Sequence, residues 1–109
     1  MQPSDDILVK RVKNGDMDAF ELLVRRYENK VYTVAYRFLG SHADASDLAQ
    51  ETFLRLYQAL PSFRGESSFV TWLYSVTANA CRDEIRRKQR TPVVSWENEV
   101  VNSGGQTVS

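Results

Sequence analysis

Apolar residues recur at steps of three and four through the first 90 residues, a spacing typical of amphipathic helices. The longest such pattern begins after Asp16 and ends at Gly40, so it predicts a long helix that closes at about Leu39. The buried stripe predicted for this helix is Phe20, Leu23, Val24, Tyr27, Val31, Val34, Ala35, Phe38 and Leu39. A shorter helix is predicted from Asp5 to Asn14, where Leu8 and Val12 lie four residues apart.

A third helix is predicted from about Asp44 to Leu60, because the residue before Pro61 avoids helical geometry. Residues 41–46 are then a short connection, and His42 is expected to be a solvated loop residue. The predicted core stripe of the third helix is Ala49, Phe53, Leu56, Tyr57 and Leu60. Its other face carries Asp47, Gln50, Glu51, Leu54 and Gln58. Such polar residues usually form a solvated face, but an apolar residue among acids and amides is typical of a docking face.

A loop rich in turn-forming residues follows from Pro61 to Ser68, and a fourth helix is predicted from Phe69 to Arg90. Either Ser67 or Ser68 can cap the start of this helix. Trp72 has a spacing that suits core packing as well as a surface role, and we expect it in the core.

The predicted architecture is a compact all-α bundle of about four helices in residues 1–90, with a flexible linker in residues 91–109. Thr91 and Pro92 break the helical pattern, and the residues after them have neither helical nor strand periodicity. Trp96 departs from this linker composition, so it either packs on the domain or is exposed.

Composition excludes several classes of function. The 109 residues carry no net charge, which argues against general binding to nucleic acid, although the charges are segregated along the chain. One histidine and one cysteine, Cys81, give no metal site, no disulfide and no catalytic pair, and a single cysteine fits a reducing cytoplasm. We find no glycine-rich phosphate loop and no long apolar run, so we expect no enzyme, no cofactor and no insertion into a membrane.

The strongest chemical signal lies between Leu60 and Arg90. Loop aromatics, a helix with Trp and Tyr, and a basic end occur in one continuous segment, a combination that suits single-stranded nucleic acid beside phosphates. Arg82, Arg86 and Arg87 are interpreted as falling on one side of the helix, where they would contact phosphates. The alternative is an ordinary loop and a buried helix with a solvated charged end.

Two adjacent motifs carry a specific resemblance. The sequence DLAQETFLRLYQAL from Asp47 to Leu60, followed by PSFRGESSFVTWLYSVTANACRDEIRR from Pro61 to Arg87, resembles region 2 of bacterial sigma factors of the extracytoplasmic-function (ECF) class. The likeness extends over roughly residues 5–90, and it implies a domain of a transcription initiation factor. In that family the domain docks on the clamp helices of the RNA polymerase beta-prime subunit and captures the non-template strand of the promoter minus-ten element.

The resemblance also implies roles for individual residues. Those implied to dock on the polymerase are Asp47, Gln50, Glu51 and Leu54, the face already selected by helical spacing. Those implied to receive an extruded base and hold the strand are Phe63, Arg64, Gly65, Glu66, Ser67, Ser68, Tyr74 and Asn79. Arg82, Arg86 and Arg87 are implied to meet DNA phosphates. An alternative for the loop is that it merely joins two helices while Phe63 fills the core.

Members of the ECF class also carry a helix-turn-helix domain that reads the minus-thirty-five element, and residues 91–109 match the linker toward it. An anti-sigma protein is a further partner that the resemblance implies. The rival interpretation from another class is a helical protein-interaction module, with an acidic docking face and no DNA recognition. Base-dependent binding of a single-stranded oligonucleotide separates these two interpretations.

Overall fold

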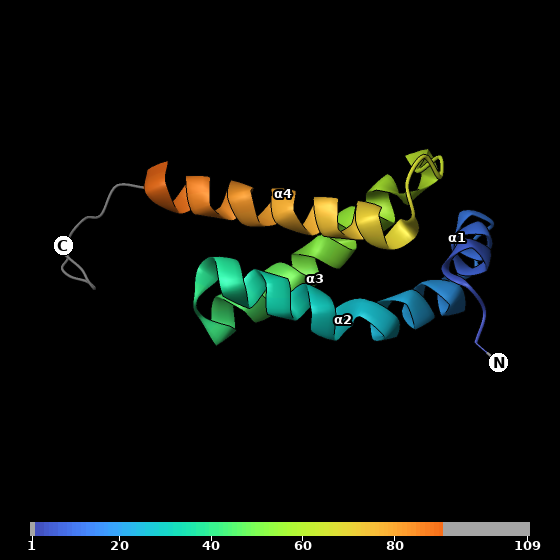
Figure 1. Ribbon diagram of the computed structural model, residues 1–109, viewed down its shortest axis with the longest axis horizontal. Coiled ribbons are helices and arrows are strands. Elements are labelled where there is room, and N and C mark those ends of the chain that lie inside the picture. Colours follow the sequence, from blue (N-terminus) through green and yellow to red (C-terminus); the bar gives the residue numbers. More distant parts are fainter. Residues whose placement is uncertain (1, 91–109) are drawn as a thin grey trace.

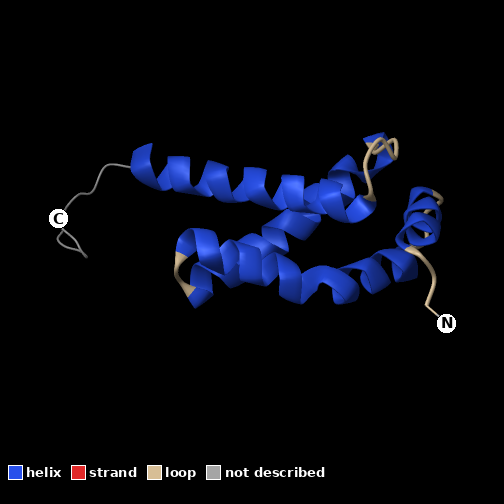
Figure 2. Cartoon of the chain, in the orientation of Figure 1, coloured by secondary structure: helices blue, strands red, loops and turns tan. Residues whose placement is uncertain are grey.

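The computed structural model describes residues 2–90, which are almost entirely helical (Figure 2). The elements in chain order are α1 (Asp5–Lys13), α2 (Met17–Leu39), α3 (His42–Ala59), the 3₁₀ helix η1 (Leu60–Ser62) and α4 (Phe69–Arg90). The prediction of an all-α domain of about four helices is therefore confirmed. The predicted linker and Trp96 lie outside the described residues.

Helix α3 contacts two of the other three helices. It packs against both α2 and α4 and runs antiparallel to each, as the short connections require (Figure 1). Helix α1 lies at the end of the molecule where α2 begins, and the loop between η1 and α4 is at the same end (Figure 1). This arrangement brings α1 close to a loop that follows it by about 50 residues in the chain.

Polar side chains set the helix starts. Asp16 accepts a hydrogen bond from the Ala19 amide at 3.2 Å at the start of α2, and Gly40 ends that helix in the left-handed conformation, with φ of 72°. Ser68, rather than Ser67, caps α4 by accepting a hydrogen bond from the Thr71 amide at 3.2 Å.

The predicted connection over residues 41–46 is wrong. Ser41 caps α3 by accepting from the Asp44 amide, so the helix begins at His42. It ends at Ala59, one residue before the predicted end, and Leu60 is the first residue of η1. His42 is exposed as expected, but it belongs to the helix and stacks on Tyr36 with ring centroids 4.5 Å apart.

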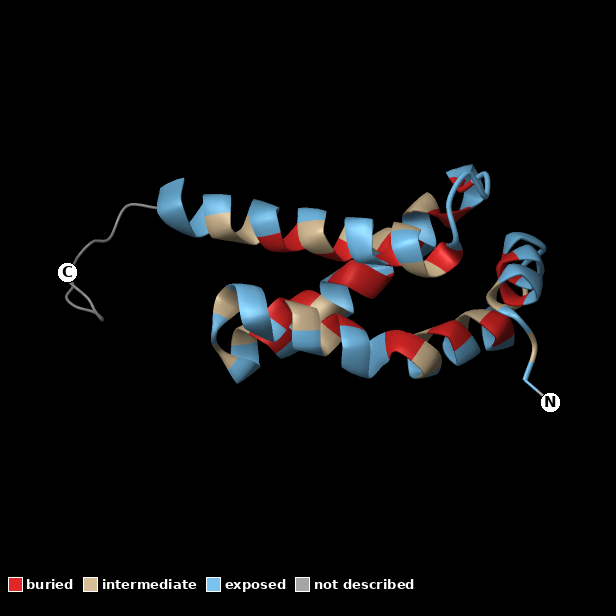
Figure 3. Ribbon diagram, in the orientation of Figure 1, coloured by how far each residue is buried: buried red, intermediate tan, exposed pale blue. Residues whose placement is uncertain are grey.

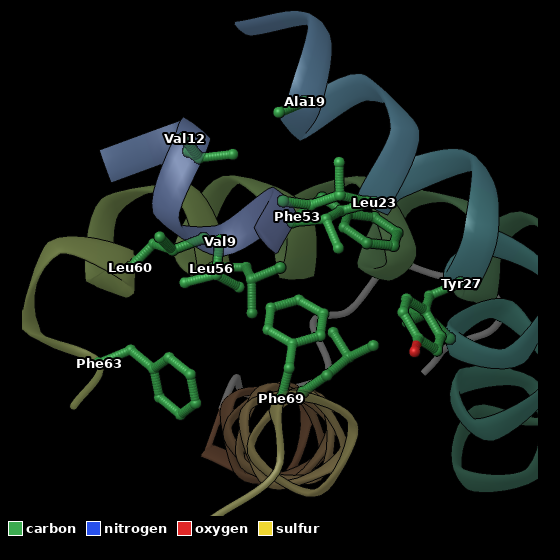
Figure 4. Packing of buried hydrophobic residues seen from close by; sticks show 13 residues of the cluster. Val9, Val12, Ala19, Leu23, Tyr27, Phe53, Leu56, Leu60, Phe63 and Phe69 are labelled. Atoms are coloured by element: carbon green, nitrogen blue, oxygen red, sulfur yellow. The ribbon is translucent and has the colours of Figure 1, made fainter. Parts of the chain in front are cut away.

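The main core lies where α1, α2, α3 and α4 meet, and its aromatic and leucine side chains converge there (Figure 4). Leu8, Leu23, Leu56 and Leu73 are completely buried in this cluster. At the other end, α2, α3 and α4 approach one another through small buried residues, namely Ala35, Ala45, Ala80 and Cys81.

Two aromatic residues predicted to be buried are exposed. Tyr57 is 43% exposed and Phe38 is 42% exposed, and the outward faces of the helices are clearly separated from the buried ones (Figure 3). On α3 the buried positions include Ala45, Leu48 and Thr52, which shifts the core stripe away from Tyr57. Thr52 is accommodated because its hydroxyl donates to the Leu48 carbonyl at 2.8 Å.

Candidate nucleic-acid interface and docking face

The predicted docking face of α3 is exposed at every position. Asp47, Gln50 and Glu51 face solvent, and Leu54 among them has 63% of its surface exposed. We call these four residues the docking face. The four residues that helical spacing grouped in the sequence thus share one surface. The exposed apolar surface of Leu54 is unfavourable in water, and a bound partner would cover it.

An apolar groove continues from the docking face toward α2. It has a volume of about 770 Å³, and Gln50 and Leu54 form part of its lining. The remaining wall is largely apolar and aromatic: Met17, Phe20, Val24, Phe53 and Tyr57. Phe20 and Tyr57 meet edge to face, with centroids 5.1 Å apart. Sequence reasoning missed this groove because it assigned Phe20, Val24 and Tyr57 to the core.

Ion pairs tie the docking face to α4. Arg55 lies 2.8 Å from Glu51 and 2.9 Å from Asp83 on α4. The hydrogen bond from Arg55 to Asp83, with a smaller contribution from Glu51, raises the pKa of the Arg55 guanidinium. Surface pairs of this kind contribute about 0–1 kcal/mol each, so they orient side chains more than they stabilise the fold.

The loop before α4 forms a pocket with α1. The pocket has a volume of about 570 Å³, and its loop wall is Phe63, Arg64, Gly65, Glu66, Ser67 and Ser68, which are the six predicted loop residues. Its second wall comes from α1, through Asp6, Val9, Lys10 and Lys13. Sequence reasoning did not find this second wall. We call the whole site the loop pocket.

The Phe63 end of the loop is held by two hydrogen bonds. The Phe63 amide donates to the Leu60 carbonyl at 3.0 Å, and the Lys13 ammonium donates to the Phe63 carbonyl. Gly65 has φ of 77°, a left-handed conformation that favours glycine, and thereby turns the loop over the pocket. The first residue of the loop is therefore anchored to both η1 and α1.

Phe63 lies at the boundary between the pocket and the core. Only 9% of its surface is exposed, and its ring stacks on Trp72 with centroids 4.5 Å apart. In Figure 4 the Phe63 ring points from the loop toward the buried cluster. Phe63 therefore packs at the edge of the core, as expected if the loop merely joins two helices. The other five loop residues are exposed. Trp72 packs against the same cluster, close to the expectation for it.

A second cleft runs along the exposed face of α4. It has a volume of about 440 Å³ and contains Tyr74, Asn79 and Arg82, three residues predicted for DNA. Tyr74 is 37% exposed, and the Arg82 guanidinium donates to Asn79 Oδ1 at 3.0 Å. Thr71, Ser75 and Ala78 complete the cleft. Their helical spacing from Tyr74 and Arg82 could have identified them from the sequence.

The three arginines predicted to share one side do not do so. Arg82 lines the α4 cleft, whereas Arg87 lines a different hollow with Asp44, Asp47 and Glu51. Five residues along a helix rotate the direction by about 140°, which separates Arg87 from Arg82. Arg86 lies 3.6 Å from Asp83.

Arg87 is engaged by a neighbouring carboxylate. It lies 2.6 Å from Glu84, and the hydrogen bond between them lowers the pKa of Glu84 and raises that of Arg87. Lys88, the next residue, forms an ion pair with Asp44 at the start of α3, at a distance of 2.5 Å. The basic end of α4 is thus partly neutralised on the side that faces α3.

Among residues 2–90, no cluster of histidine, cysteine or acidic side chains is suited to a metal ion. In the same part of the chain, no helix has the length and apolar character needed to span a bilayer.

Comparison with known proteins identifies a family. Residues 23–91, more than half of the chain, match the family described as Sigma-70 region 2. The chain is 43% identical over 108 residues to the ECF RNA polymerase sigma-E factor of Escherichia coli, covering 95% of this chain and 56% of that protein. It is 42% identical over 91 residues to the RNA polymerase sigma-H factor of Pseudomonas aeruginosa, covering 84% of this chain and 47% of that protein. The chain therefore spans about half the length of these relatives.

A solved structure has the same fold. It is an NMR structure of the complex formed by an engineered region 2 of sigmaE with GTAAAA. The TM-score is 0.76 and the sequence identity is 40%, with 82% of this chain and 93% of that chain covered.

Proposed function

Because this chain belongs to the Sigma-70 region 2 family, and specifically to its ECF class, we propose that it recognises and melts the promoter minus-ten element during transcription initiation. It does so by capturing bases of the non-template strand as the duplex opens. The observation that carries this proposal is the matching structure of an engineered sigmaE region 2 in complex with GTAAAA. The sequence identity of 40% over 93% of that domain supports carrying its binding of a single strand over to this chain.

The geometry of the described residues supports strand capture at two sites. The loop pocket receives one extruded base, and the assigned residues are Arg64, Gly65, Glu66, Ser67 and Ser68, with Phe63 as the buried anchor. The α4 cleft holds the neighbouring nucleotides through Tyr74 and Asn79, and Arg82 meets a phosphate there. Arg86 supplies a second phosphate contact along the same helix.

The free-energy cost of extruding a base and the gain from stacking it on the protein are of similar size. Extruding a base from the stack costs a few kcal/mol, and stacking a base on an aromatic ring returns about 1–3 kcal/mol. Tyr74 is suited to this role because it lines the α4 cleft and 37% of its surface is exposed. Melting then results from tighter binding to the opened strand than to the duplex, with no hydrolysis of a nucleotide.

We further propose that the docking face binds the clamp helices of the beta-prime subunit of RNA polymerase core. Asp47, Gln50, Glu51 and Leu54 offer acidic and amide groups around one apolar side chain, which suits a basic helical partner. The apolar groove beside Leu54 extends this surface and can receive apolar side chains of the same partner. The domain works in the cytoplasm, where the polymerase is, and acts as a binding factor rather than an enzyme.

The proposal also includes a further domain of the whole protein and a protein partner. Residues 91–109 serve as the linker toward a domain that reads the minus-thirty-five element, and an anti-sigma protein restrains the factor. The similarity to ECF sigma factors supports both proposals.

One observation favours a second candidate, a helical protein-interaction module without DNA recognition. Leu54 and the apolar groove form a larger apolar surface than either predicted DNA site, so protein binding alone would explain them.

The test is binding of a fluorescein-labelled single strand with the sequence GTAAAA, measured by anisotropy. A strand of the same length without bases is the matched control, because it keeps the phosphates. The proposal predicts tighter binding to the strand with bases and weaker binding to the duplex. Equal binding to both strands, or no binding to either, would favour the interaction module.

A further inference from the structure

The α1 wall of the loop pocket contains chemistry that the family assignment does not use. Asp6, Val9, Lys10 and Lys13 are spaced so that they share one face of α1, and all four line the pocket. Val9 is only 5% exposed, which anchors this face against the core. The three charged residues beside it, Asp6, Lys10 and Lys13, are exposed and line the pocket.

The polar groups of the pocket divide into engaged and unengaged sets. Lys13 donates to the Phe63 carbonyl, and the Ser68 hydroxyl accepts the capping bond from Thr71, so both already serve the loop. In the described part of the chain, no hydrogen bond or ion pair engages the Lys10 ammonium, and the same is true of Arg64 and Glu66. Asp6 is likewise unengaged among the described residues, and these four groups are available to a ligand.

We propose that Lys10 is a specificity-determining residue that donates a hydrogen bond to the edge of the base held in the loop pocket. This inference rests on the proposed function of the loop. A lysine ammonium has three donors and no acceptor, so it favours a base with a carbonyl oxygen on its edge, as guanine, cytosine and thymine have and adenine lacks. Adenine offers only ring nitrogens as acceptors, so the expected preference is for a base that bears a carbonyl oxygen.

The walls of the pocket offer hydrogen-bond acceptors as well as donors to a base edge. Asp6 lies one helical turn from Lys10 on the same wall, and Glu66 lies on the opposite wall. Three cations, Lys10, Lys13 and Arg64, line the same pocket, and the two carboxylates can accept hydrogen bonds from the amino or imino groups of a base. The mixture of donors and acceptors around Lys10 therefore matches a neutral ligand with both kinds of group.

The experiment combines a substitution with loss of the base. Lys10→Met keeps most of the aliphatic side chain and removes the ammonium, and Arg11→Met is the matched control, because Arg11 is exposed on α1 but does not line the pocket. Each variant is titrated with the strand GTAAAA, with its single-base substitutions, and with six strands that each lack one base. The pocket position is the one at which loss of the base weakens the unmodified domain most.

The proposal predicts that Lys10→Met weakens binding about tenfold for strands with a carbonyl-bearing base at the pocket position. The same variant binds within about twofold of the unmodified domain when that base is missing, and Arg11→Met changes the two strands equally. An equal loss on both strands would show that Lys10 contacts phosphate and would overturn the inference, as would unchanged binding. If the unmodified domain shows no base dependence, the proposed function itself fails.

Discussion

Leu54→Ala tests how much the docking face contributes to the free energy of polymerase binding, with little effect on the stability of the fold. With 63% of its surface exposed, Leu54 gives up little packing when it is truncated. The change removes three carbons, and burying a CH₂ group is worth about 0.8 kcal/mol. Scaled by the exposed fraction, the loss on partner binding is about 1.5 kcal/mol, or roughly tenfold in affinity.

The assay is titration of the labelled domain with purified RNA polymerase core, with thermal unfolding of each variant measured in parallel. Leu22→Ala is the matched control, since Leu22 is an exposed leucine of α2 that does not line the groove. Leu56→Ala is the opposite control, because Leu56 is fully buried two residues from Leu54, and its truncation should cost about 2–5 kcal/mol of stability.

The reasoning is refuted if Leu54→Ala binds the polymerase as tightly as Leu22→Ala does. It is also refuted if Leu54→Ala unfolds as early as Leu56→Ala, because Leu54 would then support the fold. Glu51→Ala should likewise weaken docking by about 1 kcal/mol or more while leaving the fold intact.

Three other outcomes are expected. Arg82→Ala and Arg86→Ala should each lower the salt dependence of single-strand binding by about 0.7 in the log–log slope without changing base preference; a changed preference would contradict a phosphate role. Arg87→Ala should leave this slope nearly unchanged, because Arg87 faces the acidic hollow beside α3. Burial and the hydrogen bond to Asp5 raise the pKa of Tyr27 to about 12, against about 10 when unfolded. This stabilisation is complete below pH 10 and is lost as the pH rises toward 12, by about 2 kcal/mol at pH 11.5, so urea unfolding should show a steeper alkaline loss than in Tyr27→Phe.

The sequence predicted the polar side of α3 better than its apolar side. Asp47, Gln50, Glu51 and Leu54 are exposed as predicted, since charged side chains must remain solvated and define their face unambiguously. Tyr57 and Phe38 were misplaced because an aromatic ring at helical spacing fits either a core or a groove. Only the packing of α2 against α3 decides between them.

The loop pocket shows another limit of sequence reasoning. Its loop wall could be predicted from turn-forming residues and the motif, but its second wall comes from Lys10 and Lys13 on α1, far away in the chain. Nothing local in the sequence indicates that contact, because it depends on how α1 crosses the end of the bundle. The separation of Arg87 from Arg82, by contrast, follows from helical geometry and was available from the sequence.

The central claim is that residues 64–68 select the extruded base. The most direct measurement is selection of preferred single strands from a random pool, done with the unmodified domain and with these five residues exchanged for those of a sigma factor with a different preference. Phe63 is retained in the exchange, because it belongs to the core. We predict that the preference changes at one position of the strand and stays the same elsewhere. An unchanged preference, in an exchanged domain that still folds and binds, would contradict the account.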